Sequence, residues 1–219
     1  MMKKTIVTGL ALLLMAGSAL AVPVDMVTTD DAYLDNGNPD TNNGVDAQHC
    51  VTGRDQQKAA IYEFDLTAYA GETALGDGVL NLRWGWGESS LPTLIYELTG
   101  GTFDETDVTF NNYVGVGQPD CKSILGDLVA TQVGATCYCM IEIPVPQATV
   151  QKLIDGTAQG FALVSAPETY INQCWGTKER GLLEGLEDQV PSLQCDVTPE
   201  PATLALLGLG GLVALRRRR

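Results

Sequence analysis

His49 is the only histidine of the 219-residue chain, so a serine or cysteine nucleophile would depend on this one side chain for its general base. It stands beside Cys50 in a strand-like run, where a structural or surface role is expected. Acidic side chains are densest at Asp104, Glu105 and Asp107, which we interpret as a solvated turn. No phosphate-binding loop or dinucleotide fingerprint occurs. We therefore expect no enzyme, and a polysaccharide-degrading enzyme is the least favoured alternative.

Four oxygen donors that suit calcium lie close together in a loop-forming stretch. Asp35, Asn36, Asn38 and Asp40 offer carboxylate and amide oxygens, and calcium takes about six to eight such ligands. Their spacing differs from that of an EF-hand loop. Two interpretations stay open, an Asx-rich turn and a structural Ca²⁺ site, and no other cofactor is expected.

Tryptophan rings could stack on the apolar faces of sugars. A period of two sends Leu80, Leu82, Trp84 and Trp86 to one face of a strand, so core packing is favoured for Trp84 and left open for Trp86 at the strand end. Trp175 follows Cys174 in an expected loop and is the least constrained of the three. Trp86 and Trp175 are the candidate carbohydrate-binding residues.

The cysteines are even in number, which in an exported chain indicates disulfides. Because strand neighbours two apart cannot easily bond each other, Cys137 and Cys139 are expected to take different partners, one of them Cys121. Cys174 and Cys195 are a further plausible pair, and a zinc site is disfavoured by the single histidine. All six are predicted disulfide cysteines: Cys50, Cys121, Cys137, Cys139, Cys174 and Cys195.

Short apolar or alternating runs separated by Gly, Pro, Asn and Asp predict many strands and little helix. This pattern predicts an all-β fold, a β-sandwich of jelly-roll type, with one short helix over residues 147–155. The expected strands cover residues 31–34, 49–52, 59–66, 78–86, 92–98, 108–110, 138–145, 160–165 and 193–197.

Both ends of the chain carry targeting features. Lys3 and Lys4 precede an apolar segment, and Ala19 and Ala21 form a small-x-small cleavage site, so residues 1–21 are predicted to be a cleaved signal peptide. Near the other end, the polar motif Pro199-Glu200-Pro201 precedes 13 residues without charge (203–215) and then four arginines. That apolar run is shorter than a permanent membrane span.

These C-terminal features resemble the PEP-CTERM sorting tail over residues 197–219. The resemblance implies a Gram-negative bacterium that makes exopolysaccharide, and an exosortase that cuts near Pro199, Glu200 and Pro201 after transient membrane insertion of the short hydrophobic helix. The expected location is the cell surface or extracellular matrix. An ordinary tail anchor is the alternative.

The body, residues 22–196, resembles the DNRLRE domain. The resemblance rests on the segments Asp31–Tyr33, Tyr62–Leu66, Phe103–Asn112 and Thr177–Glu179. It implies a jelly-roll sandwich that accompanies polysaccharide-acting enzymes and in some members binds carbohydrate. The six cysteines are not typical of that family.

Charge limits the partners of the body. Between Asp25 and Glu200, 27 acidic and seven basic side chains leave a net charge of −20, which repels nucleic acid and anionic lipid. We expect a non-catalytic surface protein that binds polysaccharide, either a neutral one or an acidic one held through calcium. The alternative is a purely structural or adhesive protein without a sugar site.

Overall fold

The computed structural model describes residues 21–46, 48–53, 56–87, 90–134, 138–166, 171–180 and 189–198. Several predictions fall outside these ranges. They are the signal peptide up to residue 20 with Ala19, the pairing of Cys137, and the motif Pro199, Glu200 and Pro201.

Eleven strands and four short helices make up the described body. The strands are β1 (Val22–Val27), β2 (Asp31–Asp35), β3 (Gln48–Gly53), β4 (Lys58–Glu63), β5 (Gly78–Gly87), β6 (Pro92–Leu98), β7 (Leu125–Val133), β8 (Met140–Val145), β9 (Gly160–Ser165), β10 (Ile171–Gly176) and β11 (Ser192–Val197). The helices are the 3₁₀ turns η1 (Thr67–Tyr69) and η2 (Lys122–Ile124), and α2 (Phe110–Tyr113) and α3 (Gln147–Ile154).

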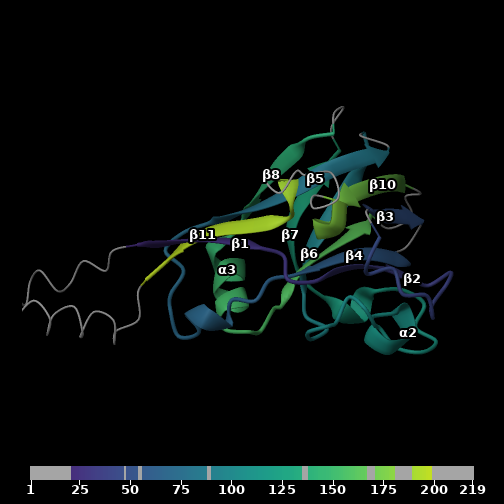
Figure 1. Ribbon diagram of the computed structural model, residues 1–219, viewed down its shortest axis with the longest axis horizontal. Coiled ribbons are helices and arrows are strands. Elements are labelled where there is room, and N and C mark those ends of the chain that lie inside the picture. Colours follow the sequence, from purple (N-terminus) through teal and green to yellow (C-terminus); the bar gives the residue numbers. More distant parts are fainter. Residues whose placement is uncertain are drawn as a thin grey trace, which may run out of the picture.

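The strands form two antiparallel sheets, and along most of the chain they alternate between them. One sheet has the order β1-β11-β5-β10-β3, with β8 on the other side of β5, and the second has the order β2-β4-β9-β6-β7. This confirms the predicted all-β sandwich (Figure 1).

Apart from its edge strand β7, the five-stranded sheet is buried on both of its faces. Tyr62 and Phe161 belong to the core between the sheets, whereas Ile61 and Ala162 belong to a second apolar cluster. That cluster is closed by the long connection after β6, through Phe110 of α2 and Ile124 of η2; Figure 1 shows α2 beyond β2 and β4. The face of the six-stranded sheet that points away from the core is therefore the sandwich face available for a site.

Three strands were not expected from the sequence, and one expected strand is wrong. β1, β7 and β10 lie outside the predicted ranges. Residues 108–110 form no strand, because Thr109 begins α2 instead: its hydroxyl accepts from the Asn112 N–H and its own N–H donates to Asn112 Oδ1. Such a reciprocal cap stabilises a helix start more than an extended strand.

Candidate functional site

Three neighbouring strands bring the polar side chains of Ser192, Asn81 and Glu142 into one row on the outer face of the six-stranded sheet, and the apolar Val27 of β1 ends the row. In the strand register Val27 of β1 lies opposite Ser192 of β11, Ser192 opposite Asn81 of β5, and Asn81 opposite Glu142 of β8. Their chain neighbours such as Leu80 point into the core. The row is the floor of a shallow groove also lined by Asp25, Met140, Val190 and Gln194.

The groove offers hydrogen-bonding groups of the kind that sugars use. Asn81 Nδ2 donates to Ser192 Oγ at 3.2 Å, and Gln194 Nε2 donates to Asp25 Oδ2 at 3.4 Å. A side-chain amide has two N–H donors and a carbonyl acceptor, so each amide keeps capacity for a ligand beyond these contacts. Such a surface can bind a polymer of hydroxyl groups.

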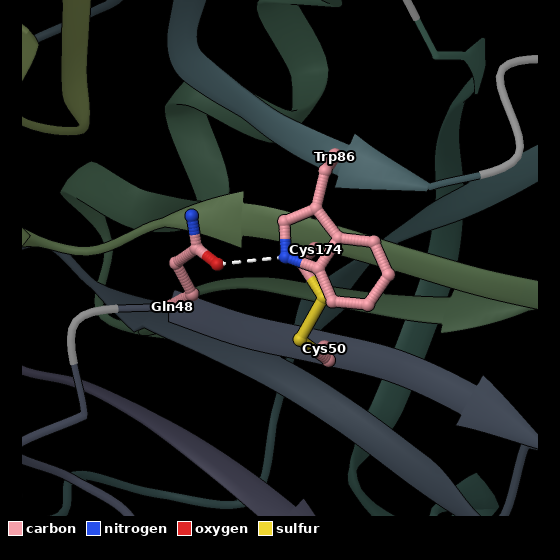
Figure 2. The surroundings of a disulfide bond; sticks show 4 residues. All are labelled: Gln48, Cys50, Trp86 and Cys174. Carbon is pink, nitrogen blue, oxygen red and sulfur yellow. Dashed lines mark hydrogen bonds between the residues drawn. A yellow bond between two sulfur atoms is a disulfide. The ribbon is translucent and has the colours of Figure 1, made fainter. Parts of the chain in front are cut away.

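Trp86 lies further along β5, on the same outer face, and its ring is partly exposed. The side chain is 42 % exposed, and its Nε1–H donates to Gln48 Oε1 at 2.8 Å. Trp86 is paired with Cys174 of β10, which is bonded to Cys50 of β3 (Figure 2). The indole is therefore held by a hydrogen bond on one edge and rests on a covalently fixed strand pair.

A β-bulge at Gly85 explains why Trp86 does not share the face of Trp84. Trp84 lies opposite Trp175, but Trp86 lies opposite Cys174, so β5 has one residue more than β10 between these pairs. A Cβ on Gly85 would lie 2.7 Å from the Cys174 carbonyl oxygen, closer than any side chain tolerates. The bulge ends the predicted alternation after Trp84 and turns Trp86 outward.

Trp175 is not a sugar platform, and that prediction is wrong. It lies in β10, between β5 and β3, and is completely buried. Its ring packs edge-to-face on Trp84, with centroids 5.1 Å apart. A residue of a central strand that faces the partner sheet is part of the core, which confirms the interpretation of Trp84 as a core residue.

The disulfide pattern differs from the predicted one. Cys174 bonds Cys50, because antiparallel pairing sets them directly opposite with their Cα atoms 4.0 Å apart; the predicted pair with Cys195 is wrong. Cys121 and Cys195 are free thiols, not disulfide cysteines. They cannot meet, since they belong to separate apolar clusters. Cys139 is disulfide-bonded, and the prediction for Cys137 lies outside the described residues.

The free thiols should be unreactive until the protein unfolds. Burial, reinforced by neighbouring Asp196, raises the pKa of Cys195 to about 11, and burial raises that of Cys121 further. The thiolate is the nucleophile, so alkylation at pH 8 should be slow in native protein and complete at Cys121 and Cys195 in unreduced, denatured protein. Mass spectrometry of alkylated peptides checks this. Fast native labelling of either site would contradict it.

Residues 35–40 form a turn, and their side chains form hydrogen bonds with one another or with other parts of the chain. Burial alone would raise the pKa of Asp35, but hydrogen bonds from Lys58, Asn38 and the Gly37 N–H lower it overall. Asn36 Nδ2 donates to the Pro119 carbonyl, and Asp40 accepts from Asn111. The geometry thus favours the Asx-rich turn, and among the described residues no group of three His, Cys, Asp or Glu could hold a metal ion.

His49 is occupied in a buried contact between the sheets. Its Nε2 lies 2.7 Å from Asp31 Oδ1, and both side chains are fully buried. The other Asp31 oxygen accepts from the Lys178 N–H. In the predicted acidic turn, the Asp104 carboxylate accepts from the N–H and hydroxyl of Thr106, which lowers its pKa. These contacts are structural.

The comparison with known families identifies the C-terminal end. Residues 197–219 match the PEP-CTERM protein-sorting motif. A search of curated proteins finds no match to the chain. In the part of the chain that the structure describes, no helix is long and apolar enough to span a membrane.

The match defines the class of the protein. It is exported, it is sorted by exosortase, and it belongs at the surface or outside a Gram-negative cell. The prediction of a PEP-CTERM tail is confirmed. The DNRLRE resemblance is shown by no family match and stays a prediction.

Proposed function

We propose that the exported body binds polysaccharide, without catalysis, on the outer face of the six-stranded sheet. The observation that carries the proposal is the partly exposed ring of Trp86, fixed by Gln48 and supported by the Cys50–Cys174 bond. An exposed indole ring offers a flat apolar face on which the apolar face of a sugar can stack. A ring that is held in place before binding loses little conformational entropy when a sugar stacks on it.

The groove lies on the same face as Trp86, further back along β5. From Asn81 to Trp86 the strand advances by about 16 Å, which is the length of several sugar units rather than of one. Amide and hydroxyl groups at one end and an aromatic platform at the other suit an extended chain of sugars. This supports binding within a polymer.

Charge favours a neutral polysaccharide. Asp25 and Glu142 line the groove, and the body as a whole is strongly acidic. A carboxylate accepts hydrogen bonds from sugar hydroxyls but repels an acidic polymer. An acidic polysaccharide would need bridging calcium, so chelator should not weaken binding if the neutral ligand is the right one.

Substitution of Trp86 tests the proposal. Processed protein should co-sediment with extracellular polysaccharide from the producing cells, and Trp86→Ala should weaken the affinity by roughly thirtyfold, the effect of losing one aromatic anchor. Trp86→Phe should recover much of it. The control Leu128→Ala removes an exposed apolar side chain from β7 of the other sheet and should bind like the parent. Absence of binding by the parent would favour the structural or adhesive alternative.

A further inference from the structure

The two processed ends of the chain lie side by side at one end of the sandwich. β1 starts at Val22, directly after the predicted signal cleavage site, and pairs with β11 so that Val22 lies opposite Val197. Val197 is also the first residue of the sorting match. Figure 1 shows β1 and β11 together, with the start of β1 and the end of β11 on the same side.

The last residues of β11 are also held on their other edge. Val197 forms a bridge with Ala74, and the Leu75 N–H donates to the Asp196 carbonyl. Beyond the strand, the Thr198 N–H donates to the Thr73 carbonyl at 2.9 Å, and the Thr73 N–H donates back to Thr198 Oγ1 at 3.1 Å. Asp196 and Val197 are therefore paired on both sides, and Thr198 is held on one side by Thr73.

Helix α3 braces the segment that holds them. Gln151 accepts from the Ala74 N–H and donates to the Glu72 carbonyl, and Gln147 donates to the Ala74 carbonyl. Residues 72–75 are thus tied to the folded body, and Thr198 is tied to residues 72–75. Pro199, the first residue of the PEP motif, follows Thr198 in the sequence without a spacer.

We propose that the folded body acts as a gate on its own sorting, because it holds the residues that precede the PEP motif. An enzyme that cuts a peptide commonly binds it as an extended strand and uses its backbone hydrogen-bonding groups. In residues 196–198 these groups are already used by β1 and by residues 73–75. Exosortase therefore cuts near the motif only after this end of β11 has opened. The rate of processing is then proportional to the small population of chains in which this end is open. This inference concerns delivery and is independent of the polysaccharide proposal.

Thr198 provides the test, in the full precursor made by the native cell. Thr198→Val removes the acceptor for the Thr73 N–H. Loss of one hydrogen bond should raise the open population about fivefold, so the half-time of processing should fall about fivefold. Thr198→Ser keeps the hydroxyl and should process like the parent. Thr131→Val, on exposed β7, is the matched control and should also leave the half-time unchanged. Pulse-chase labelling with immunoblotting gives the half-times.

A spacer separates gating from direct recognition of the threonine. A spacer of six residues, made of Gly and Ser and inserted after Thr198, moves the PEP motif away from the body. This spacer should shorten the half-time of processing at least as much as Thr198→Val does. Adding Thr198→Val to the spacer chain should then change nothing further. Equal half-times for the parent, Thr198→Val and spacer chains would overturn the gate. So would an effect of Thr198→Val that persists in full behind the spacer.

Discussion

Trp175→Ala is expected to lower the free energy of unfolding by about 4 kcal/mol, the usual cost of truncating a fully buried tryptophan. The ring has no exposed surface and packs on Trp84 between the sheets, so its removal leaves a cavity that the sheets cannot close. Urea unfolding followed by circular dichroism measures the loss. The slope of the free energy of unfolding against urea concentration should stay the same if the folded and unfolded states keep their compactness.

Trp86→Ala is the matched control for this prediction. The same ring is removed from the neighbouring register position on β5, but the side chain is 42 % exposed, and a loss of about 1 kcal/mol is expected. The two tryptophans thus separate stability from binding. Equal losses for both variants would contradict the assignment of one to the core and the other to the surface.

Removal of the Cys50–Cys174 bond should have an effect of similar size. The bond closes a loop with a sequence separation of 124 residues, and the chain-entropy account gives about 5 kcal/mol for such a loop. The double variant Cys50→Ala/Cys174→Ala should melt roughly 10 °C lower. Reduced parent protein should melt no higher than the variant, because reduction also opens the disulfide of Cys139.

Cys195→Ala is the control for the disulfide variant. It removes a buried sulfur without breaking a bond, so only the lost apolar contact counts, about 1 kcal/mol. A disulfide variant that melts with the parent would show that the bond does not stabilise the fold.

Local pattern was enough to predict the strands that carry clear alternation or continuous apolar residues. β5 alternates, with Leu80 and Leu82 in the core, and β9 is a continuous apolar run up to Val164 because it is covered on both faces. β7 carries Gly126 and Asp127 and is an edge strand with much exposure. β10 carries the polar residues Asn172 and Gln173 directly after its first residue, Ile171. β7 and β10 form strands because neighbouring strands pair with them, and the local sequence pattern carries no information about this pairing.

The candidate site depended on register, which the sequence did not reveal. The bulge at Gly85 places Trp86 outside, and a bulge is a property of two paired strands rather than of one. The disulfide follows from Cys50 and Cys174 being opposite across β3 and β10. By contrast, the sorting tail was predictable in full, because its motif, apolar run and arginines are contiguous in the chain.

The indole N–H signals of the three tryptophans give the most direct test of polysaccharide binding. Processed, ¹⁵N-labelled protein is titrated with soluble fragments of the extracellular polysaccharide, and the signals are assigned with Trp86→Phe. We predict that the Trp86 signal shifts progressively, because its ring and its hydrogen bond to Gln48 lie at the site, while the buried Trp84 and Trp175 signals stay nearly unchanged. Binding that leaves the Trp86 signal in place, or no shift at saturating fragment, would contradict the proposed site.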